Sequence, residues 1–409
     1  MAYSSVEAKS IQELCKVIDC EHKTAPYVEK SDYLVVRTSN VRNGRMVMED
    51  MKYTTLEGFK AWTQRAVPEV GDVLFTREAP AGEVCLVPKD KKVCMGQRMV
   101  MLRPNREKVD PLFLSLVLAT EKSKFDILRL SIGSTVSRIN IADIKKLRIA
   151  APPLLEQRKV AQILSTWDKA IATTEQLLTN SQQQKKALMQ KLLTGNKRLQ
   201  GYSGDWKQYQ LSDISKVIVS PVDKKSVAGE IPVEICNYTD VYYHHEITKE
   251  INFMKATASN NEIEKYSLKI GDVIITKDSE TPGDIAVPAL VSEELNGVVC
   301  GYHLAIVRPN KSAVSGAFLN YLFSMPKTRY YFFTLATGAT RFGLSIGAIN
   351  KAQFSIPTVD EQQKIANLLS ISDKEIKALK QKLHYLKQEK KALMQQLLTG
   401  KRRVKVGAA

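Results

Sequence analysis

Apolar residues recur at alternating steps of four and three along two long segments of the chain, each of which follows a proline. In the second segment the pattern runs through ten positions from Ile365 to Leu397, and eight of them are apolar. The matching positions of the first segment run from Val160 to Leu192, and seven of the ten are apolar. A sustained repeat of about 3.5 residues predicts two helices that pair along a narrow seam as a coiled coil.

The alternative is that each helix is amphipathic and lies on its own globular part. Gln, Lys and Asn residues cover the rest of both segments and leave only a narrow apolar stripe, which favours the coiled coil. Gly195 and Gly400 stand where a left-handed residue would end each helix. The positions expected to form the spacer helices and to dock partners are Val160, Leu164, Trp167, Ile171, Leu178, Leu188, Leu192, Ile365, Leu369, Ile376, Leu383, Leu393 and Leu397.

The two segments are copies of one another. Glu156 to Gly195 matches Glu361 to Gly400 at an offset of 205 residues, with 22 identities in 40 positions. The similarity extends upstream, where Gly71-Asp72-Val73 matches Gly271-Asp272-Val273 at an offset of 200 residues. A duplicated chain predicts a monomer with an internal pseudo-two-fold repeat.

Each copy opens with a part that has the pattern of short strands and helices. Four β-branched runs flanked by Gly, Asp or Pro predict strands: Tyr33 to Val36, Val73 to Thr76, Val84 to Val87 and Met99 to Leu102. Asp110-Pro111 predicts the start of a helix. The fold class is therefore α+β, with two mixed α/β globular parts at 1–153 and 199–357, helices at 154–198 and 358–402, and a basic tail at 403–409.

Chain lengths favour an antiparallel pair of helices. A helix of 38 residues is roughly 57 Å long, whereas the link of about ten residues that follows Gly195 reaches at most ~35 Å. That link suffices if the second globular part begins where the first helix ends. A long traverse inside the second globular part would also permit parallel helices.

The chain of 409 residues carries 60 basic and 43 acidic residues, a net charge of +17. This excess favours a polyanionic partner, although ribosome-associated and membrane-surface proteins share it. No apolar run is long enough to span a membrane, so a cytoplasmic protein is expected. The six cysteines form no Cys-x-x-Cys pair, and neither a zinc ribbon nor a redox motif is predicted.

Motifs for catalysis are missing from the sequence. It has no phosphate-binding loop, no dinucleotide fingerprint and no Asn/Asp-Pro-Pro-aromatic segment of the kind that amino-methyltransferases use. The loop carboxylates Glu78, Glu83, Asp278, Glu280 and Asp284 lack the spacing of a nuclease metal site and are interpreted as surface acids. A binding protein without a metal or cofactor of its own is therefore expected.

Residues that recognise DNA should be basic, amide or aromatic side chains on loops of the globular parts. Equivalent loops of the two copies hold different residues, such as Arg98 against His303, which is expected if the copies recognise different sequences. Any single candidate is at least as well explained as a solvated loop residue. The candidates are Arg37, Thr38, Asn40, Arg42, Arg77, Gln97, Arg98, Ser134 and Thr135 in the first copy, and Asn237, Tyr238, Lys277, Tyr302, His303, Thr340 and Arg341 in the second.

These features together resemble the specificity subunit of type I restriction-modification enzymes over essentially the whole chain. The resemblance rests on the segment 71–80, on Gly96-Gln97-Arg98-Met99, on 152–157 and on the second opening Gly204-Asp205-Trp206. It implies two target-recognition domains, a non-catalytic chain that binds double-stranded DNA, and an antiparallel helical spacer that docks two methyltransferase subunits. It also implies motor-nuclease subunits, with S-adenosylmethionine, ATP and magnesium bound by the partners, adenine methylation and ATP-dependent cleavage. The second copy departs from the pattern at Gly301-Tyr302-His303.

Two other functions fit the sequence less well. One is a stand-alone bipartite DNA-binding or architectural protein that has no methyltransferase partner. The other is a self-contained nuclease, which the lack of metal-spaced acids disfavours.

Overall fold

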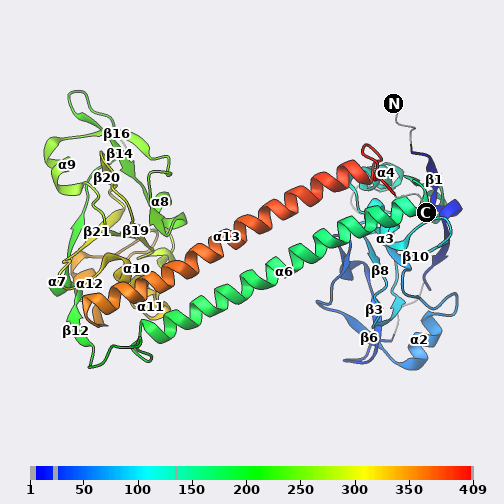
Figure 1. Ribbon diagram of the computed structural model, residues 1–409, viewed down its shortest axis with the longest axis horizontal. Coiled ribbons are helices and arrows are strands. Elements are labelled where there is room, and N and C mark those ends of the chain that lie inside the picture. The colour runs from blue at the N-terminus through cyan, green and yellow to red at the C-terminus, as the bar shows by residue number, and fades with distance from the viewer. Residues whose placement is uncertain (1–5, 22–25, 134–136, 224, 407–409) are drawn as a thin grey trace. The chain divides into compact units, whose positions relative to one another are not determined.

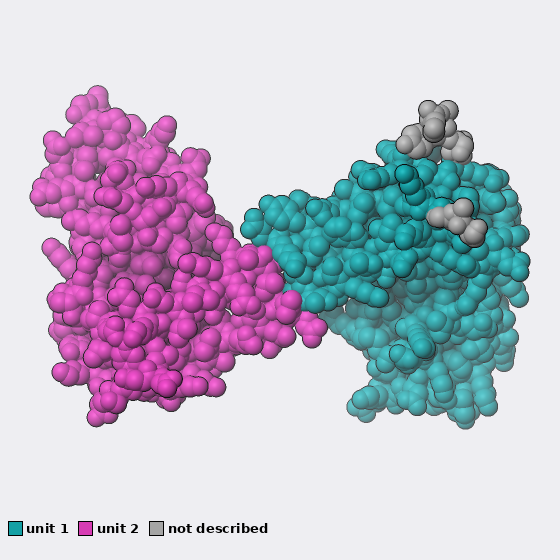
Figure 2. Space-filling model, viewed as in Figure 1, with its two compact units in different colours: residues 1–175, 381–409 teal, residues 176–380 magenta. Residues whose placement is uncertain are grey.

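The computed structural model describes residues 6–21, 26–133, 137–223 and 225–406. The chain forms two compact units that do not follow its linear order. Unit 1 combines residues 1–175 with 381–409, and unit 2 contains residues 176–380 (Figure 2). Each unit therefore contains one globular domain and a part of both long helices.

The two long helices are α6 (Leu154–Leu192) and α13 (Val359–Leu397), each of 39 residues (Figure 1). In unit 1, Asp168 is 2.7 Å from Lys390, and Glu175 is 2.7 Å from Lys387. The position on α13 falls as the position on α6 rises, so the helices are antiparallel. The predicted antiparallel coiled coil is confirmed. Helix α6 begins directly after Pro153, and α13 begins two residues after Pro357.

Most predicted seam positions lie between the helices or against a domain. Val160, Leu164 and Ile171 are buried on α6, and Ile365 and Leu369 are buried on α13. Gly195 and Gly400 both have a φ of 74°, the left-handed conformation predicted at the helix ends. One predicted seam residue differs, because Leu188 is 38% exposed and therefore faces solvent.

Unit 1 contains a four-stranded sheet in the order β2-β10-β7-β8 and a three-stranded sheet in the order β6-β3-β9. Strands β1 and β11 pair separately, as do β4 and β5. The strands are β1 (Ala8–Ser10), β2 (Cys15–Asp19), β3 (Tyr33–Val36), β4 (Val41–Arg42), β5 (Arg45–Met46), β6 (Lys52–Thr54), β7 (Val73–Thr76), β8 (Val84–Leu86), β9 (Lys92–Met95), β10 (Met99–Pro104) and β11 (Arg148–Ala150). The helices are α1 (Ile11–Leu14), η1 (Thr38–Asn40), α2 (Leu56–Trp62), α3 (Pro111–Leu118), α4 (Glu121–Leu130) and α5 (Ile141–Lys146).

Unit 2 repeats this plan with a five-stranded sheet in the order β13-β21-β17-β19-β15 and a three-stranded sheet in the order β16-β14-β20. The strands are β12 (Lys207–Gln210), β13 (Ser215–Val219), β14 (Ile231–Cys236), β15 (Glu246–Ile247), β16 (Met254–Ala258), β17 (Val273–Thr276), β18 (Asp278–Ser279), β19 (Pro288–Val291), β20 (Val298–Cys300), β21 (Leu304–Pro309), β22 (Phe342–Gly343) and β23 (Gln353–Ile356). The helices are α7 (Leu211–Ile214), α8 (Tyr238–Tyr243), α9 (Asn260–Tyr266), η2 (Pro282–Asp284), α10 (Gly316–Ser324), α11 (Pro326–Leu335) and α12 (Ile346–Asn350).

Equivalent central strands of the two units share the same burial and the same preceding ion pair. Strands β7 and β17 are buried at every position, as is typical of a central strand covered on both faces. Each follows an aspartate that is paired with an arginine of the neighbouring strand: Asp72 with Arg103 at 2.8 Å, and Asp272 with Arg308 at 2.7 Å.

The side chain of Asp110 accepts a hydrogen bond from the backbone of Phe113, which confirms the predicted start of α3.

The core of each unit is completed by the beginning of one long helix and the end of the other. In unit 1, Val160 and Leu164 of α6 and Leu397 of α13 share a buried cluster with the sheet and α3. In unit 2, Leu369 of α13 and Leu192 of α6 do the same. The helices are therefore part of the domain cores as well as partners of one another.

An ion pair with a buried carboxylate lies beside each of these junctions. Glu156, at the start of α6, is 2.6 Å from Arg403, which follows α13. At the equivalent place in unit 2, Glu361 is 2.6 Å from Arg198, which follows α6. The four residues obey the offset of the sequence repeat, so the link after the first helix and the tail after the second helix have the same structural role.

The junction can be tested by a pair of neighbouring leucines on α13. Leu369 is fully buried in the core of unit 2, whereas Leu368 is 42% exposed. We expect Leu369→Ala to lower the free energy of unfolding by about 2–5 kcal/mol, and Leu368→Ala to change it by no more than about 0.5 kcal/mol. Chemical denaturation of the full-length chain measures both. Equal effects of the two substitutions would contradict this description of the junction.

Candidate nucleic-acid interface

The first predicted loop of unit 1 uses most of its polar groups to hold its own shape. Asn40 is fully buried, accepts a hydrogen bond from the backbone of Arg37 and donates to the carbonyls of Val47 and Glu49. Its burial leaves no polar atom for a ligand, so we do not retain it as a DNA contact. The side chain of Arg37 is 2.8 Å from that of Asp50. Thr38 follows Arg37 directly and begins η1.

Two other predicted residues are turned inward. Arg42 donates from Nη1 to the carbonyl of Thr38 at 2.8 Å. Arg77 is only 6% exposed, with Nη1 at 3.3 Å from Asp19 and Nε at 3.5 Å from the carbonyl of Ile139. A charged side chain so buried and paired braces its domain, because moving it towards solvent would break its contacts with Asp19 and the Ile139 carbonyl. We therefore assign Arg77 a structural role.

The turn before β10 is the most accessible basic position among the predicted residues of unit 1. Gln97 and Arg98 are both exposed in this turn. The Arg98 side chain is 56% exposed, and its Nε is 3.2 Å from Glu78. Ser134 and Thr135, predicted as phosphate contacts, lie outside the described residues.

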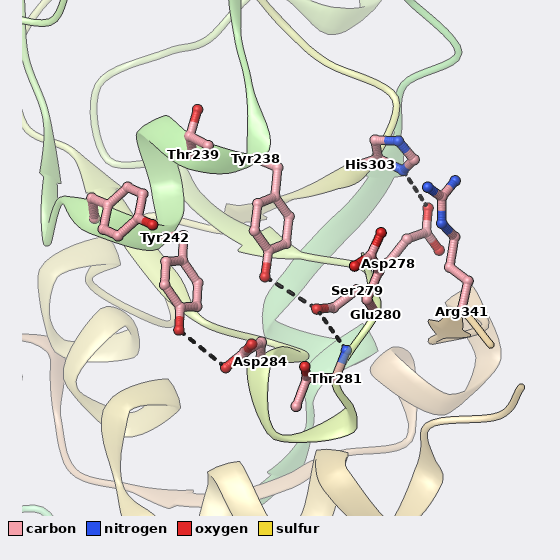
Figure 3. A pocket seen from close by; sticks show the side chains of 11 residues that line it. Tyr238, Thr239, Tyr242, Asp278, Ser279, Glu280, Thr281, Asp284, His303 and Arg341 are labelled. Carbon is pink, nitrogen blue, oxygen red and sulfur yellow. Dashed lines mark hydrogen bonds and ion pairs between the residues drawn. The ribbon is translucent and has the colours of Figure 1, made fainter. Parts of the chain in front are cut away.

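In unit 2, predicted residues from three separate loops meet at one cavity of about 480 Å³ (Figure 3). Tyr238 begins α8, His303 precedes β21, and Arg341 precedes β22. The segment that follows β17, which includes β18 and η2, forms another side of the cavity with Asp278, Ser279, Glu280, Thr281 and Asp284. A concave site of this size with several convergent polar groups is typical of ligand recognition.

Hydrogen bonds orient the side chains that line the cavity. The hydroxyl groups of Tyr238 and Ser279 are 3.1 Å apart, and the Tyr242 hydroxyl donates to Asp284 at 3.2 Å. Burial raises the pKa of Tyr238, and the charge of Asp284 raises the pKa of Tyr242. Both phenols therefore stay protonated at neutral pH and can donate or accept hydrogen bonds.

The remaining predicted residues of unit 2 lie around this cavity or beside it. Lys277 donates to both oxygens of Asp278, at 2.6 and 2.5 Å, and its side chain is only 17% exposed. Asn237 donates to the carbonyl of Ile235 at the start of α8. The ring centroids of Tyr302 and His303 are 3.6 Å apart with their planes tilted by 41°, and Thr340 and Arg341 are exposed.

Several lining residues were not among the predicted DNA contacts. Tyr243, Ser279 and Thr281 were not predicted, and Asp278, Glu280 and Asp284 were interpreted as surface acids. The run of tyrosines that includes Tyr242 was the available signal for Tyr243. The carboxylates gave none, because their role depends on a fold that brings distant loops together.

The described residues include no group of three or more His, Cys, Asp or Glu placed to hold a metal ion. All six cysteines are buried free thiols. Among the helices that the structure describes, none combines the length and the apolar character needed to cross a membrane.

The model of the type I restriction modification DNA specificity domain matches residues 3–180 and 203–388, one copy in each half of the chain. The chain belongs to this family. The specificity subunit of the putative type I restriction enzyme MjaX from Methanocaldococcus jannaschii is 25% identical to it, over 98% of this chain and 94% of that protein. The EcoKI specificity subunit of Escherichia coli is 22% identical, over 82% and 74%.

Solved structures of the type I specificity family have the same fold. The HsdS subunit from Thermoanaerobacter tengcongensis aligns with a TM-score of 0.52 over 97% of both chains, at 18% identity. The S subunit of a type I restriction-modification system from M. genitalium aligns with a TM-score of 0.61 over 96% of both chains, at 15% identity. Two mixed α/β domains with two long helices are thus the architecture of the family.

Arg77 and Arg98, two of the four predicted arginines of unit 1, can be compared to test whether one is structural and the other is not. We expect Arg77→Met to lower the free energy of unfolding by about 2 kcal/mol, because Asp19 and the Ile139 carbonyl lose a buried charged donor. Arg98→Met removes an exposed pair and should change stability by no more than about 1 kcal/mol. Thermal unfolding of both proteins measures the difference. A destabilisation by Arg98→Met that equals that of Arg77→Met would contradict the assignment.

Proposed function

We propose that this chain is the DNA-recognition subunit of a type I restriction-modification complex and that each globular domain recognises one half of a bipartite duplex target. The observation that carries the proposal is the repetition of one scaffold with different chemistry in its loops. The pairs Asp72–Arg103 and Asp272–Arg308 hold equivalent strands in place. The turns before β10 and β21 differ, with an exposed Arg98 in one domain and a half-buried His303 in the other.

The chemistry of the exposed loops suits a DNA duplex. A net charge of +17 favours association with a polyanion. Exposed groups such as Gln97 and Arg98 in the first domain, and Tyr302 and Arg341 with the half-buried His303 in the second, can hydrogen-bond to base edges or phosphates. Arg37 and Arg42 are half-buried and fit phosphate contacts at the rim of the first domain better than base contacts. Asn40 and Arg77 brace the first domain, and Lys277 with Asn237 does so in the second.

We infer that the long helices dock the catalytic partners. Large apolar side chains remain exposed on them, including Leu177 at 48%, Leu188 at 38%, Ile371 at 62% and Tyr385 at 53%. Exposed apolar surface of this kind marks protein interaction sites. It favours a docked subunit over a stand-alone DNA-binding protein. Because the helix pair is internally repeated, two methyltransferase subunits should bind, one for each copy.

The assembled complex would supply the chemistry that this chain lacks. We propose that the methyltransferase subunits bind S-adenosylmethionine and methylate adenine in the target. Motor-nuclease subunits, which use ATP and magnesium, would cleave unmodified DNA. The complex would work in the cytoplasm, where it meets the host chromosome and incoming DNA.

Exchange of one domain tests the division of labour. Residues 1–153 are replaced by the same part of a relative, and 154–409 are kept. The donor should retain apolar residues that contact Val160, Leu164, Leu397 and Leu398, because these complete the core. We expect methylome sequencing to find a motif with one half changed and the other half intact.

The reciprocal exchange of residues 199–357 is the matched control and should change only the other half. A chimera that folds and binds its methyltransferase but changes both halves, or neither, would contradict the proposal. Absence of any methylated motif with the wild-type chain and its cognate methyltransferase would contradict it as well.

A further inference from the structure

A carboxylate contacts the candidate base-reading residue, called the reader below, at the same place in both domains: Arg98, which is exposed, and His303, which is half-buried. In unit 1, Glu78 is 3.2 Å from Nε of Arg98. In unit 2, Asp278 is 3.3 Å from Nδ1 of His303. The two places are structurally equivalent, because the backbone of Arg77 donates to the Arg98 carbonyl at 2.8 Å and that of Lys277 donates to the His303 carbonyl at 2.9 Å.

The contact with the carboxylate determines which side-chain nitrogens of Arg98 or His303 remain available to DNA. Glu78 occupies Nε of Arg98 and leaves the two terminal nitrogens, which are both donors, on a side chain that is 56% exposed. Two adjacent donors match O6 and N7 of guanine in the major groove. The first domain therefore offers donors at this position.

Histidine responds differently to the same neighbour. An ionised carboxylate only accepts hydrogen bonds, so Nδ1 of His303 must carry the proton when it faces Asp278. In a neutral imidazole the other nitrogen, Nε2, is then an acceptor. Burial lowers the pKa of His303 against the opposing effect of Asp278, and Arg341 and Lys277 lower it further. The ring is therefore neutral at physiological pH.

We propose that His303, oriented by Asp278, accepts a hydrogen bond through Nε2 from the exocyclic amino group of an adenine or a cytosine in the target of the second domain. His303 is the specificity-determining residue and Asp278 is its positioning residue. The inference rests on the proposed DNA-recognition function, and it adds that the two domains use opposite hydrogen-bonding roles at equivalent positions. It also explains why a basic protein places a carboxylate in this cavity, since Asp278 fixes the proton on the ring.

Lys277 makes the inference testable by a single substitution. Its ammonium donates to both oxygens of Asp278. In Asp278→Asn the remaining amide oxygen should stay with Lys277, because an amide N–H₂ group cannot accept from an ammonium. The N–H₂ group then faces His303, so Nδ1 must accept and Nε2 must carry the proton. The reader becomes a donor and should prefer guanine or thymine.

The experiment uses the full chain co-expressed with its cognate methyltransferase. Methylome sequencing first gives the wild-type motif, and duplexes carrying each base at each position of that motif are then methylated in vitro. Asp278→Asn should shift the preference at one position of the second half-site about tenfold, from adenine or cytosine to guanine or thymine. His303→Arg, which keeps Asp278, should shift the same position about tenfold towards guanine.

Glu250→Gln is the matched control, because this exposed acid in the turn before β16 is not among the residues that line the cavity. It should leave every base preference unchanged. The inference is overturned if the wild-type motif is bipartite and neither variant changes its second half, or if the two variants change different positions. Should Asp278→Asn fail to fold, His303→Arg alone decides. A wild-type complex without a bipartite motif would instead refute the underlying function.

Discussion

The buried carboxylates of Glu156 and Glu361 each accept a charged hydrogen bond from an arginine that lies beyond the end of the other long helix. Glu361 is fully buried and Glu156 is 5% exposed. Removing the arginine from such a pair leaves an uncompensated charge in a region of low dielectric, which is costly. The buried carboxylate of each domain is therefore paired only when the distant segment that carries Arg403 or Arg198 is in place. This requirement ties the two copies of the sequence into reciprocal units.

The interactions that build the scaffold are the ones that the duplication has kept. The side chains of Gln157 and Gln362 donate to the carbonyls of Pro152 and Pro357, at 2.8 and 2.9 Å. Asp168 pairs with Lys390, and Asp373 pairs with Lys185, between the two helices. The loops that carry the reader residues have diverged instead. A fixed frame with variable loops allows one half-site to change without rebuilding the other.

Local patterns in the sequence predicted the frame well. Strands β3 and β7 match the predicted runs, and Asp110 begins a helix because its side chain caps the chain locally. Chain lengths favoured the antiparallel pairing, although they also permitted parallel helices. The strands and helix starts were the clearest predictions. Such features depend on neighbours in sequence, so periodicity and capping residues are sufficient to find them.

The interface was predicted less completely, because it depends on contacts between distant residues. Nothing near Arg77 in sequence indicates that it will be buried beside Asp19. Asn40 is of a residue type that is common in exposed loops. The cavity of unit 2 joins loops that are up to about a hundred residues apart, from Tyr238 to Arg341. The pairing of Asp278 with His303 became visible only when those loops were brought together.

Amide hydrogen exchange in two arginine variants tests most directly whether the start of each long helix depends on the arginine that follows the other helix. Arg403→Ala should accelerate exchange in the first turns of α6, at residues 157–170, and leave residues 362–375 of α13 protected. Arg198→Ala should have the opposite effect, with a loss of about 3 kcal/mol of local stability in each case. If Arg403→Ala accelerated exchange at the start of α13, or if neither variant changed the start of either helix, the account would be wrong.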